Sequence, residues 1–175
     1  MKCFEPTYYA KNIYQIPLSF YKENGIRALF LDLDNTLDAF DALVPSSEAK
    51  ELIAKLQKIG LKIFIVSNNH EERVKKYADE LGVDYSFHSL KPFAFRLNKF
   101  IKKHNLNKQE ILMVGDQTVT DIKCSNALKV RGCLVDKLVD RDQPTTTFNR
   151  FFDKKIRKKL ENKGILKERE INYGN

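Results

Sequence analysis

Residues 29–37 read Leu-Phe-Leu-Asp-Leu-Asp-Asn-Thr-Leu, and this stretch decides the fold. An apolar run typical of a buried strand ends in two carboxylates at alternate positions. Alternate side chains of a strand point to the same side, so Asp32 and Asp34 leave the strand close together. Such a pair repels itself unless a cation or a shared proton stabilises it. The pair therefore indicates a divalent-cation site, or a nucleophile beside a general acid, and points to phosphoryl chemistry.

Predicted strands and helices alternate along the rest of the chain. The apolar runs predict strands at residues 27–33, 61–66, 83–87, 111–114 and 132–135. Helical spacing of apolar residues predicts helices at 46–59, 70–81, 120–128 and 147–160, and a further helix that Lys91-Pro92 opens, with Phe93 on its apolar face. This alternation predicts an α/β fold with a parallel sheet covered by helices on both faces.

The length of 175 residues predicts one domain, 1–175. Residues 1–25 are rich in aromatic side chains, and we expect an irregular segment with short helical turns that packs on the domain. Residues 147–175 are expected to form a basic helix and a tail. The chain has three cysteines without a CxxC pair, no apolar leader and no apolar run of membrane-spanning length. These features predict a cytoplasmic protein, with peripheral attachment to the inner face of the membrane as an open alternative.

Polar residues follow several predicted strands directly. Asp32 and Asp34 follow the first strand, Ser67-Asn68-Asn69 the second, Lys91 the loop after the third, and Asp116 the fourth. Each cluster by itself has a plain interpretation, such as a turn, a helix cap or a solvated lysine. In parallel sheets, however, ligands bind at the carboxyl ends of the strands, where all four clusters would meet. Their order therefore predicts a site for phosphoryl transfer.

The same residues resemble the four motifs of the haloacid dehalogenase (HAD) phosphatases. The matching stretches, in the order that the family has them, are residues 31–37, 65–69, 91–92 and 114–121. Residues 6–9, 13–14 and 147–150 add a likeness to the YqeG-type branch, subfamily IIIA. The resemblance implies a Rossmann-like HAD fold and a hydrolase that works through an aspartyl-phosphate.

The resemblance also implies a role for each matching residue. Asp32 would be the nucleophile and Asp34 the general acid and base. The phosphoryl group would be bound by Thr36, Ser67, Asn68 and Lys91. A Mg²⁺ cofactor would be held by Asp32, the backbone carbonyl of Asp34, Asp116 and Asp121.

The spacing of the motifs bears on the substrate. Residues 38–60 and 67–91 are too short to hold a separately folded lid, so we expect a capless protein with an open site. An open site is suited to a phosphate on something large. Relatives in mitochondria and plastids convert phosphatidylglycerophosphate to phosphatidylglycerol, and the resemblance implies that substrate here. A soluble or protein-bound phosphate remains the alternative within the same class.

The C-terminal segment carries an excess of positive charge. The whole chain has a net charge of +8, and residues 149–170 contain nine Lys or Arg and four Asp or Glu. One interpretation is a solvated helix face; another is an anionic partner, either a membrane surface or, as a non-enzymatic alternative with vestigial catalysis, RNA or a ribosome. For the apolar stripe of this helix, Phe148, Phe151, Phe152, Ile156 and Leu160, we expect packing on the sheet rather than in a lipid interface.

Overall fold

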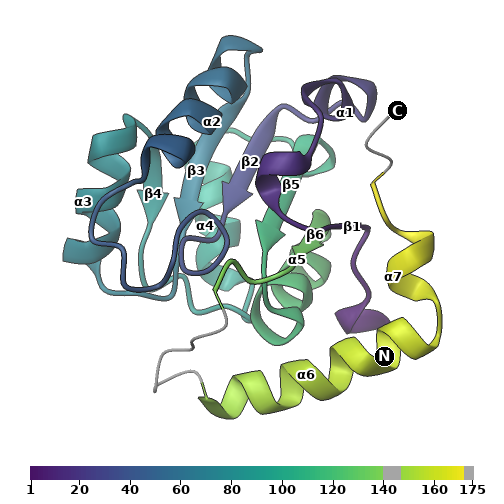
Figure 1. The fold of residues 1–175 in the computed structure, drawn as a ribbon. Helices are drawn as coiled ribbons and strands as arrows, with labels where there is room; N and C mark the ends of the chain where they lie inside the picture. Colours follow the sequence, from purple (N-terminus) through teal and green to yellow (C-terminus); the bar gives the residue numbers. More distant parts are fainter. Residues whose placement is uncertain (140–146, 172–175) are drawn as a thin grey trace.

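A computed structural model of the protein describes residues 1–139 and 147–171, and these form one parallel sheet with helices on both faces (Figure 1). The strand order is β1-β6-β5-β2-β3-β4. The strands are β1 (Tyr8–Ala10), β2 (Ala28–Leu31), β3 (Lys62–Val66), β4 (Asp84–Ser86), β5 (Ile111–Gly115) and β6 (Arg131–Val135). Every pairing is parallel, so all carboxyl ends lie at one edge of the sheet. The predicted α/β fold class is confirmed.

Two apolar layers sandwich this sheet. Helices α1 (Leu18–Glu23), α2 (Ser47–Lys58) and α3 (Glu71–Leu81) bury their side chains against Leu29, Leu31 and their neighbours on one face. On the other face, α4 (Phe95–Lys103) and α5 (Lys123–Leu128) pack on Phe30, Met113 and the residues around them. Alternate side chains of each strand belong to opposite layers, as expected for a sheet buried on both faces.

The first two long helices follow their sequence signals closely. The Ser46 hydroxyl accepts a hydrogen bond from the Ala49 amide and caps α2. Helix α3 ends at Gly82, which has a positive φ of 63°. Both helices lie in the intervals between motifs, and their apolar sides belong to the main core. Neither interval, 38–60 or 67–91, builds a separate lid, so the capless architecture is confirmed.

The N-terminal segment departs from the prediction in one element. We expect an irregular segment with short helical turns that packs on the domain, and such turns are present at Lys2–Phe4, Ile13–Gln15 and Leu18–Glu23, with Ile13, Phe20 and Tyr21 in the main core. The exception is Tyr8–Ala10, which form the edge strand β1, paired with β6. The other side of β1 meets the end of the chain, because Tyr9 exchanges backbone hydrogen bonds with Arg169 and Ile171. A three-residue strand is too short to show an alternation of apolar and polar residues. It forms because its backbone finds partners on both sides.

The helix after Lys91 was also placed wrongly. We expected Lys91-Pro92 to open it, but α4 begins at Phe95, and the Lys91–Pro92 peptide is cis. Phe93 is 66% exposed and does not belong to the apolar face of the helix. The local reason is a turn, in which the Phe93 amide donates to the Leu90 carbonyl and Leu90 has a positive φ. This turn directs Lys91 inward.

Helix α6 (Thr147–Asn162) lies beside the carboxyl ends of the strands, and α7 (Ile165–Glu168) follows it (Figure 1). Leu160 is buried against Ile122 and Leu134, and Ile156 packs beside them. Phe151 and Phe152, in contrast, are 57% and 44% exposed. The expectation that the whole stripe packs on the sheet is thus wrong for these two phenylalanines. Phe148 has no described side chain, so its part of that expectation lies outside the described residues.

A buried polar contact fixes α6 to the loop after β5. Asp153 is 4% exposed, and its carboxylate accepts hydrogen bonds from the Thr118 amide at 2.5 Å and the Thr118 hydroxyl at 2.6 Å. Arg157, one turn along, donates to Asp153, to Asp136 and to the carbonyl oxygen of Asp116. The helix is therefore held by groups that also shape the loop. Among the described helices, none is long and apolar enough to cross a membrane.

We expect Asp153→Ala to lower the free energy of unfolding by about 3–5 kcal/mol, because the Thr118 donors and Arg157 would lose a buried acceptor. Chemical denaturation followed by circular dichroism measures this loss. Asp79→Ala is the matched control, since Asp79 forms an exposed pair with Lys75 one turn away on α3. Equal losses in the two variants would contradict a structural role for the α6 contact.

Candidate active site

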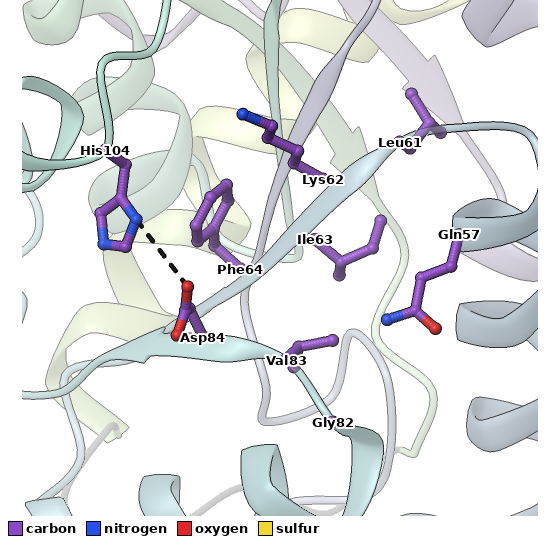
Figure 2. A pocket seen from close by; sticks show the side chains of 9 residues that line it. All are labelled: Gln57, Leu61, Lys62, Ile63, Phe64, Gly82, Val83, Asp84 and His104. Carbon is purple, nitrogen blue, oxygen red and sulfur yellow. Dashed lines mark ion pairs between the residues drawn. The ribbon is translucent and has the colours of Figure 1, made fainter.

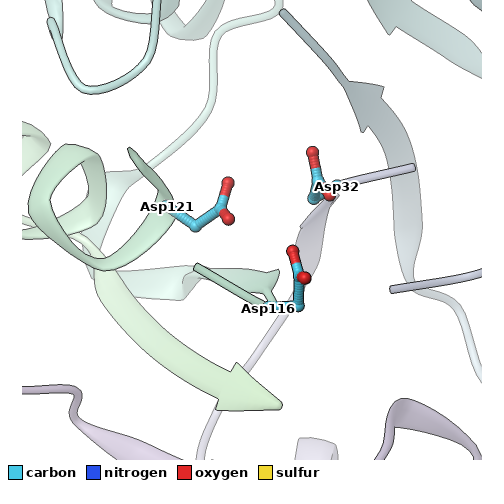
Figure 3. Close-up of side chains that lie close together, drawn as sticks. All are labelled: Asp32, Asp116 and Asp121. Atoms are coloured by element: carbon cyan, nitrogen blue, oxygen red, sulfur yellow. The ribbon is translucent and has the colours of Figure 1, made fainter. Parts of the chain in front are cut away.

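Three buried carboxylates converge at the carboxyl edge of the sheet. The side chains of Asp32, Asp116 and Asp121 each place an oxygen within 4.8 Å of the other two. Figure 3 shows them facing the same space from three separate segments. Asp116 is fully buried, Asp121 is 1% exposed and Asp32 is 8% exposed. Such concentrated negative charge out of water requires nearby cations.

The pairing of β2 with β5 brings Asp32 and Asp116 together. Leu31 of β2 lies opposite Val114 of β5, and the Asp32 amide extends the ladder by donating to the Val114 carbonyl. Asp32 and Asp116 therefore leave neighbouring strands at the same level. This adjacency is the one that the parallel arrangement predicts for residues directly after two paired strands.

Asp121 is positioned by a helical turn and not by a strand end. Residues Thr118–Ile122 form a π-helical turn, which precedes α5 in place of the regular helix expected from residue 120. Within this turn Asp121 accepts hydrogen bonds from the Gln117 amide and the Thr120 hydroxyl. Gly115 makes the approach possible, because a Cβ there would lie 2.3 Å from the Asp121 Cγ. The glycine before Asp116 is thus required by the packing of Asp121 against the backbone.

Lys91 connects the carboxylates. Its Nζ lies 2.5 Å from an Asp32 oxygen, 2.7 Å from an Asp121 oxygen and 3.0 Å from the Val66 carbonyl. The side chain is buried, and the segment is held by Asn68, whose side-chain amide donates to the Lys91 carbonyl and accepts from its amide. Lys91 and Asn68 therefore form a rigid link between the ends of β3 and β4 and the acidic cluster.

The pKa values follow from this burial and crowding. Burial raises the pKa of Asp32 well above its ordinary value; Lys91 opposes the rise, and Asp121, Asp116 and Asp34 add to it. Burial raises the pKa of Asp116 to about 7, against the opposing effect of Arg150. Burial alone would lower the pKa of Lys91, but Asp121 and Asp32 outweigh it and raise that pKa, so the ammonium stays charged.

Asp34 lies beside the cluster with partners of its own. Its carboxylate accepts from Arg73 of α3 at 2.5 Å and from the Asn69 side chain at 2.9 Å. Arg73 also donates to the carbonyls of Phe40 and Ala42 in the loop after β2. The structure therefore brings Asp34 near the other carboxylates while giving it a separate cation. Nothing in the sequence singles out Arg73, because it is one of many charged residues on an amphipathic helix.

The predicted phosphate-binding residues also lie at this edge. The Thr36 hydroxyl is 3.4 Å from an Asp32 oxygen, and Ser67 is buried with its hydroxyl accepting from the Asn69 amide. The Asn68 side chain is engaged with Lys91, so the backbone amide is the group it has left to offer a phosphate. All eight predicted site residues are thus gathered here, although their roles remain predictions.

Arg150 at the start of α6 also belongs to the site, and no sequence pattern marks it. Its guanidinium forms an ion pair of 2.6 Å with Asp116. The sequence showed only a run of basic residues there, and nothing in such a run separates one arginine from its neighbours. The contact exists because Asp153 and Arg157 fix α6 to the loop after β5.

The donor set is suited to a hard divalent cation. Four carboxylates, those of Asp32, Asp34, Asp116 and Asp121, face three cations, those of Lys91, Arg73 and Arg150. This leaves excess negative charge, and the free ligand atoms of the triad are carboxylate oxygens, which Mg²⁺ prefers. Asp32 and Asp121 share Lys91, and Asp116 is paired with Arg150. These three carboxylates are therefore compatible with a metal site.

A second hollow lies at the opposite end of the sheet (Figure 2). It has a volume of about 300 Å³ and surrounds the first residues of β3 and β4, where the Nδ1 of His104 lies 3.8 Å from an Asp84 carboxylate oxygen. Besides this pair, the residues that line it are Gln57, Leu61, Lys62, Ile63, Phe64, Gly82 and Val83. The chemistry-bearing residues gather instead at the carboxyl edge, as in other α/β proteins.

We expect Lys91→Ala to cost about 3–5 kcal/mol in the free energy of unfolding, because Asp32 and Asp121 would lose their shared buried cation. Lys103→Ala, an exposed change on α4, is the control. Without Lys91 the pKa of Asp32 rises further above its ordinary value of 3.8. The folded variant then binds protons that the unfolded chain has released, so the loss should shrink as the pH falls from about 8 to about 5. Urea denaturation across that range measures it; a loss independent of pH would contradict the assignment.

Comparisons with known proteins agree with this geometry. The family model of the haloacid dehalogenase-like hydrolases matches residues 4–127. "Probable phosphatase YqeG" of Bacillus subtilis is 31% identical over 169 residues, which cover 97% of this chain and 98% of that protein. A copper-transporting ATPase of Helicobacter pylori is 39% identical over 101 residues, but this stretch covers only 13% of that protein.

Solved structures show the same fold. A protein from Listeria monocytogenes serotype 4b aligns with a TM-score of 0.51 at 20% identity, over 69% of this chain and 88% of that one. A structure titled "putative 3-deoxy-D-manno-octulosonate 8-phosphate phosphatase from Vibrio cholerae" aligns with a TM-score of 0.52 at 15% identity, over 69% and 71% of the two chains. Together with the family match and the full-length relative, they show that this chain belongs to the haloacid dehalogenase-like hydrolases and is a phosphatase of that family.

Proposed function

We propose that the protein is a Mg²⁺-dependent phosphatase that forms an aspartyl-phosphate on Asp32 and acts on phosphatidylglycerophosphate. The observation that supports the reaction and its metal is the buried triad of Asp32, Asp116 and Asp121, with Lys91 bonded to two of its members. Asp34 lies beside the triad and is paired with a different cation, Arg73. One carboxylate is thus available as a nucleophile while another is available as an acid.

The proposed reaction has two steps. An Asp32 oxygen attacks the phosphorus, and the bond to the leaving oxygen breaks while Asp34 supplies a proton to that oxygen. Asp34 then accepts a proton from water as the water attacks the phosphorus of the aspartyl-phosphate. The bond between the phosphorus and the Asp32 oxygen breaks, which releases inorganic phosphate and restores the Asp32 carboxylate. Arg73 and Asn69 hold the Asp34 carboxylate during both steps.

The remaining residues stabilise charge. Lys91 orients Asp32 and offsets the negative charge of the phosphoryl oxygens, and Ser67 with the Asn68 amide provides donors to them. Mg²⁺ on Asp32, Asp116 and Asp121 would supply further positive charge next to the transferred group. The fully buried Asp116 and Asp121 are held by the β5 end and the π-helical turn, so these ligands are arranged before any substrate arrives.

The open site supports a substrate that is itself part of a large surface. Apolar residues gather around the carboxyl edge, namely Leu43 and Val44 after β2, Leu90, Phe93 and Phe95 after β4, and Phe151 and Phe152 on α6, all at least 40% exposed. Phe152 and Pro92 line the same small hollow beside Thr120, so α6 and the loop after β4 lie on the same side of the molecule. We define these seven residues as the apolar rim.

The apolar rim and the basic α6 together favour a lipid substrate over a small metabolite. Exposed aromatic side chains flanked by lysines are typical of surfaces that lie in a membrane interface. Lys155 lies over the Phe151 ring, so cation and aromatic residue are adjacent on this surface. Attraction of the net charge of +8 to anionic lipid would bring the site to the substrate.

The decisive measurement is phosphate release from phosphatidylglycerophosphate in mixed micelles with Mg²⁺. We expect turnover by the natural chain and its loss, by at least about a thousandfold, in Asp32→Asn, because the amide cannot act as the nucleophile. Circular dichroism checks that the variant is folded.

A panel of soluble phosphate esters separates the alternatives. Turnover of soluble esters alone would support the phosphatase activity and refute the lipid substrate. No turnover of any ester, combined with salt-sensitive RNA binding that survives Asp32→Asn, would favour the nucleic-acid alternative.

A second prediction concerns the apolar rim. We expect Phe93→Ser combined with Phe151→Ser to lower the rate on micellar lipid roughly tenfold, with little change for a soluble ester, because interfacial contact is lost while the site is intact. Leu18→Ser combined with Ile59→Ser is the matched control, since both residues are exposed at the opposite end of the sheet. Equal effects of the two double variants, or equal losses on lipid and ester, would refute the interfacial role.

A further inference from the structure

A groove begins at the active site and runs along α6. It has a volume of about 890 Å³, with Asp116 and Arg150 at one end and Glu161 and Asn162 at the other. Lys154 and Lys158 line the groove between these ends. The groove therefore meets the triad at Asp116, and Phe151 of the apolar rim also lines it, so a substrate bound at the triad can extend along α6 beside the rim.

Most charges in the groove are already engaged. Arg157 donates to the carboxylates of Asp153 and Asp136 and to two carbonyl oxygens, so it acts within the structure. Arg150 is paired with Asp116, and the other carboxylate near it, Asp153, is held by Thr118. These groups neutralise one another and leave little capacity for a ligand.

Lys154 and Lys158 are different. Both are exposed, and within the described residues neither ammonium has a carboxylate or carbonyl partner. They are one turn apart on the groove side of α6. Of the carboxylates that line the groove, Glu161 is exposed, and Asp136, whose side chain is 47% exposed, is paired with Arg157. Two like charges that converge on a hollow beside a phosphate site attract an anion.

The helix sets the distances. A helix rises 1.5 Å per residue, so Lys154 lies roughly 6 Å along α6 from Arg150, which contacts Asp116, and Lys158 lies roughly 12 Å along it. Lys154 is therefore within reach of a group a few bonds from the reacting phosphate. Lys158 is placed for a longer extension of the same substrate.

We propose that Lys154 and Lys158 form a subsite for a second anionic group of the substrate, a phosphodiester that remains after the monoester is cleaved. This inference rests on the proposed phosphatase function and adds the residues that select the substrate. Lys154 contributes most, because it lies nearer the site. The subsite distinguishes a phosphomonoester joined through a short carbon bridge to a phosphodiester from a simple phosphomonoester.

The test compares two soluble esters that share the cleaved bond. Glycerophosphoglycerophosphate carries the phosphodiester and glycerol 3-phosphate lacks it, and neither requires a membrane. We expect the natural chain to have the higher kcat/KM on the former. Lys154→Ala should reduce this preference about tenfold, chiefly through KM, which is the effect of losing one charge-assisted hydrogen bond. Turnover of glycerol 3-phosphate should stay unchanged, and Lys154→Arg should restore the preference.

The same helix provides the controls. Lys155→Ala and Lys159→Ala remove the same charge from exposed positions that do not line the groove. If they reduce the preference as much as Lys154→Ala and Lys158→Ala, the effect is general attraction and the subsite is refuted. If the natural chain hydrolyses both esters with equal kcat/KM, the subsite is refuted and the proposed phosphatase activity is still supported.

Two further arms separate the remaining outcomes. Calorimetric titration of Asp32→Asn with each ester measures binding without turnover, and Lys154→Ala in that background should weaken only the binding of glycerophosphoglycerophosphate. If the natural chain hydrolyses neither ester, but binding by Asp32→Asn depends on Lys154, the proposed function is refuted and the subsite is retained. Phosphatidylglycerophosphate in neutral micelles should show the same lysine dependence if the anion comes from a lipid head group, whereas dependence confined to the soluble ester assigns it to a free metabolite.

Discussion

The buried ammonium of Lys91 between Asp32 and Asp121 is the interaction on which the site depends. Carboxylates this close and this buried cannot all remain ionised without a cation among them. Lys91 is delivered by the turn after β4 and locked by Asn68, so the ends of β3 and β4 are joined to those of β2 and β5. Asp32 is fixed by the end of β2, whereas Lys91 and Asp121 are held by the turn after β4 and by the π-helical turn after β5.

Helix α6 is integrated into the same arrangement. Asp153 and Arg157 fix it to the loop that carries Asp116, and Arg150 reaches the Asp116 carboxylate. The outer residues of the helix are left exposed, with lysines along one side and phenylalanines beside them. One helix therefore supports a proposed metal ligand and presents the surface along which a lipid phosphate would be held.

Two carboxylates of similar type are given different surroundings by this architecture. Asp32 shares Lys91 with Asp121 inside the protein, whereas Asp34 is paired with Arg73 and Asn69 at the surface of the site. The two carboxylates are therefore held by different cations, which allows the nucleophile and the proposed acid to be oriented independently. The loop after β2 contributes by accepting two hydrogen bonds from Arg73.

The sequence by itself determined the alternation of strands and helices, the parallel sheet and the place of the predicted residues at strand ends. These are local properties: an apolar run followed by polar residues specifies both a buried strand and what leaves its carboxyl end. Ser46 and Gly82 likewise mark the ends of their helices with side-chain and backbone chemistry that acts within a few residues.

Only the tertiary structure decided the rest. The strand β1 exists because β6 and residues 169–171 supply hydrogen-bond partners, and α4 starts late because Lys91 is drawn into the acidic cluster. Arg73 and Arg150 enter the site, and Lys154 becomes distinct from Lys155, through the docking of helices far away in the chain. A charged residue on an amphipathic helix carries no local mark of its partner, because that partner is set by packing between distant segments.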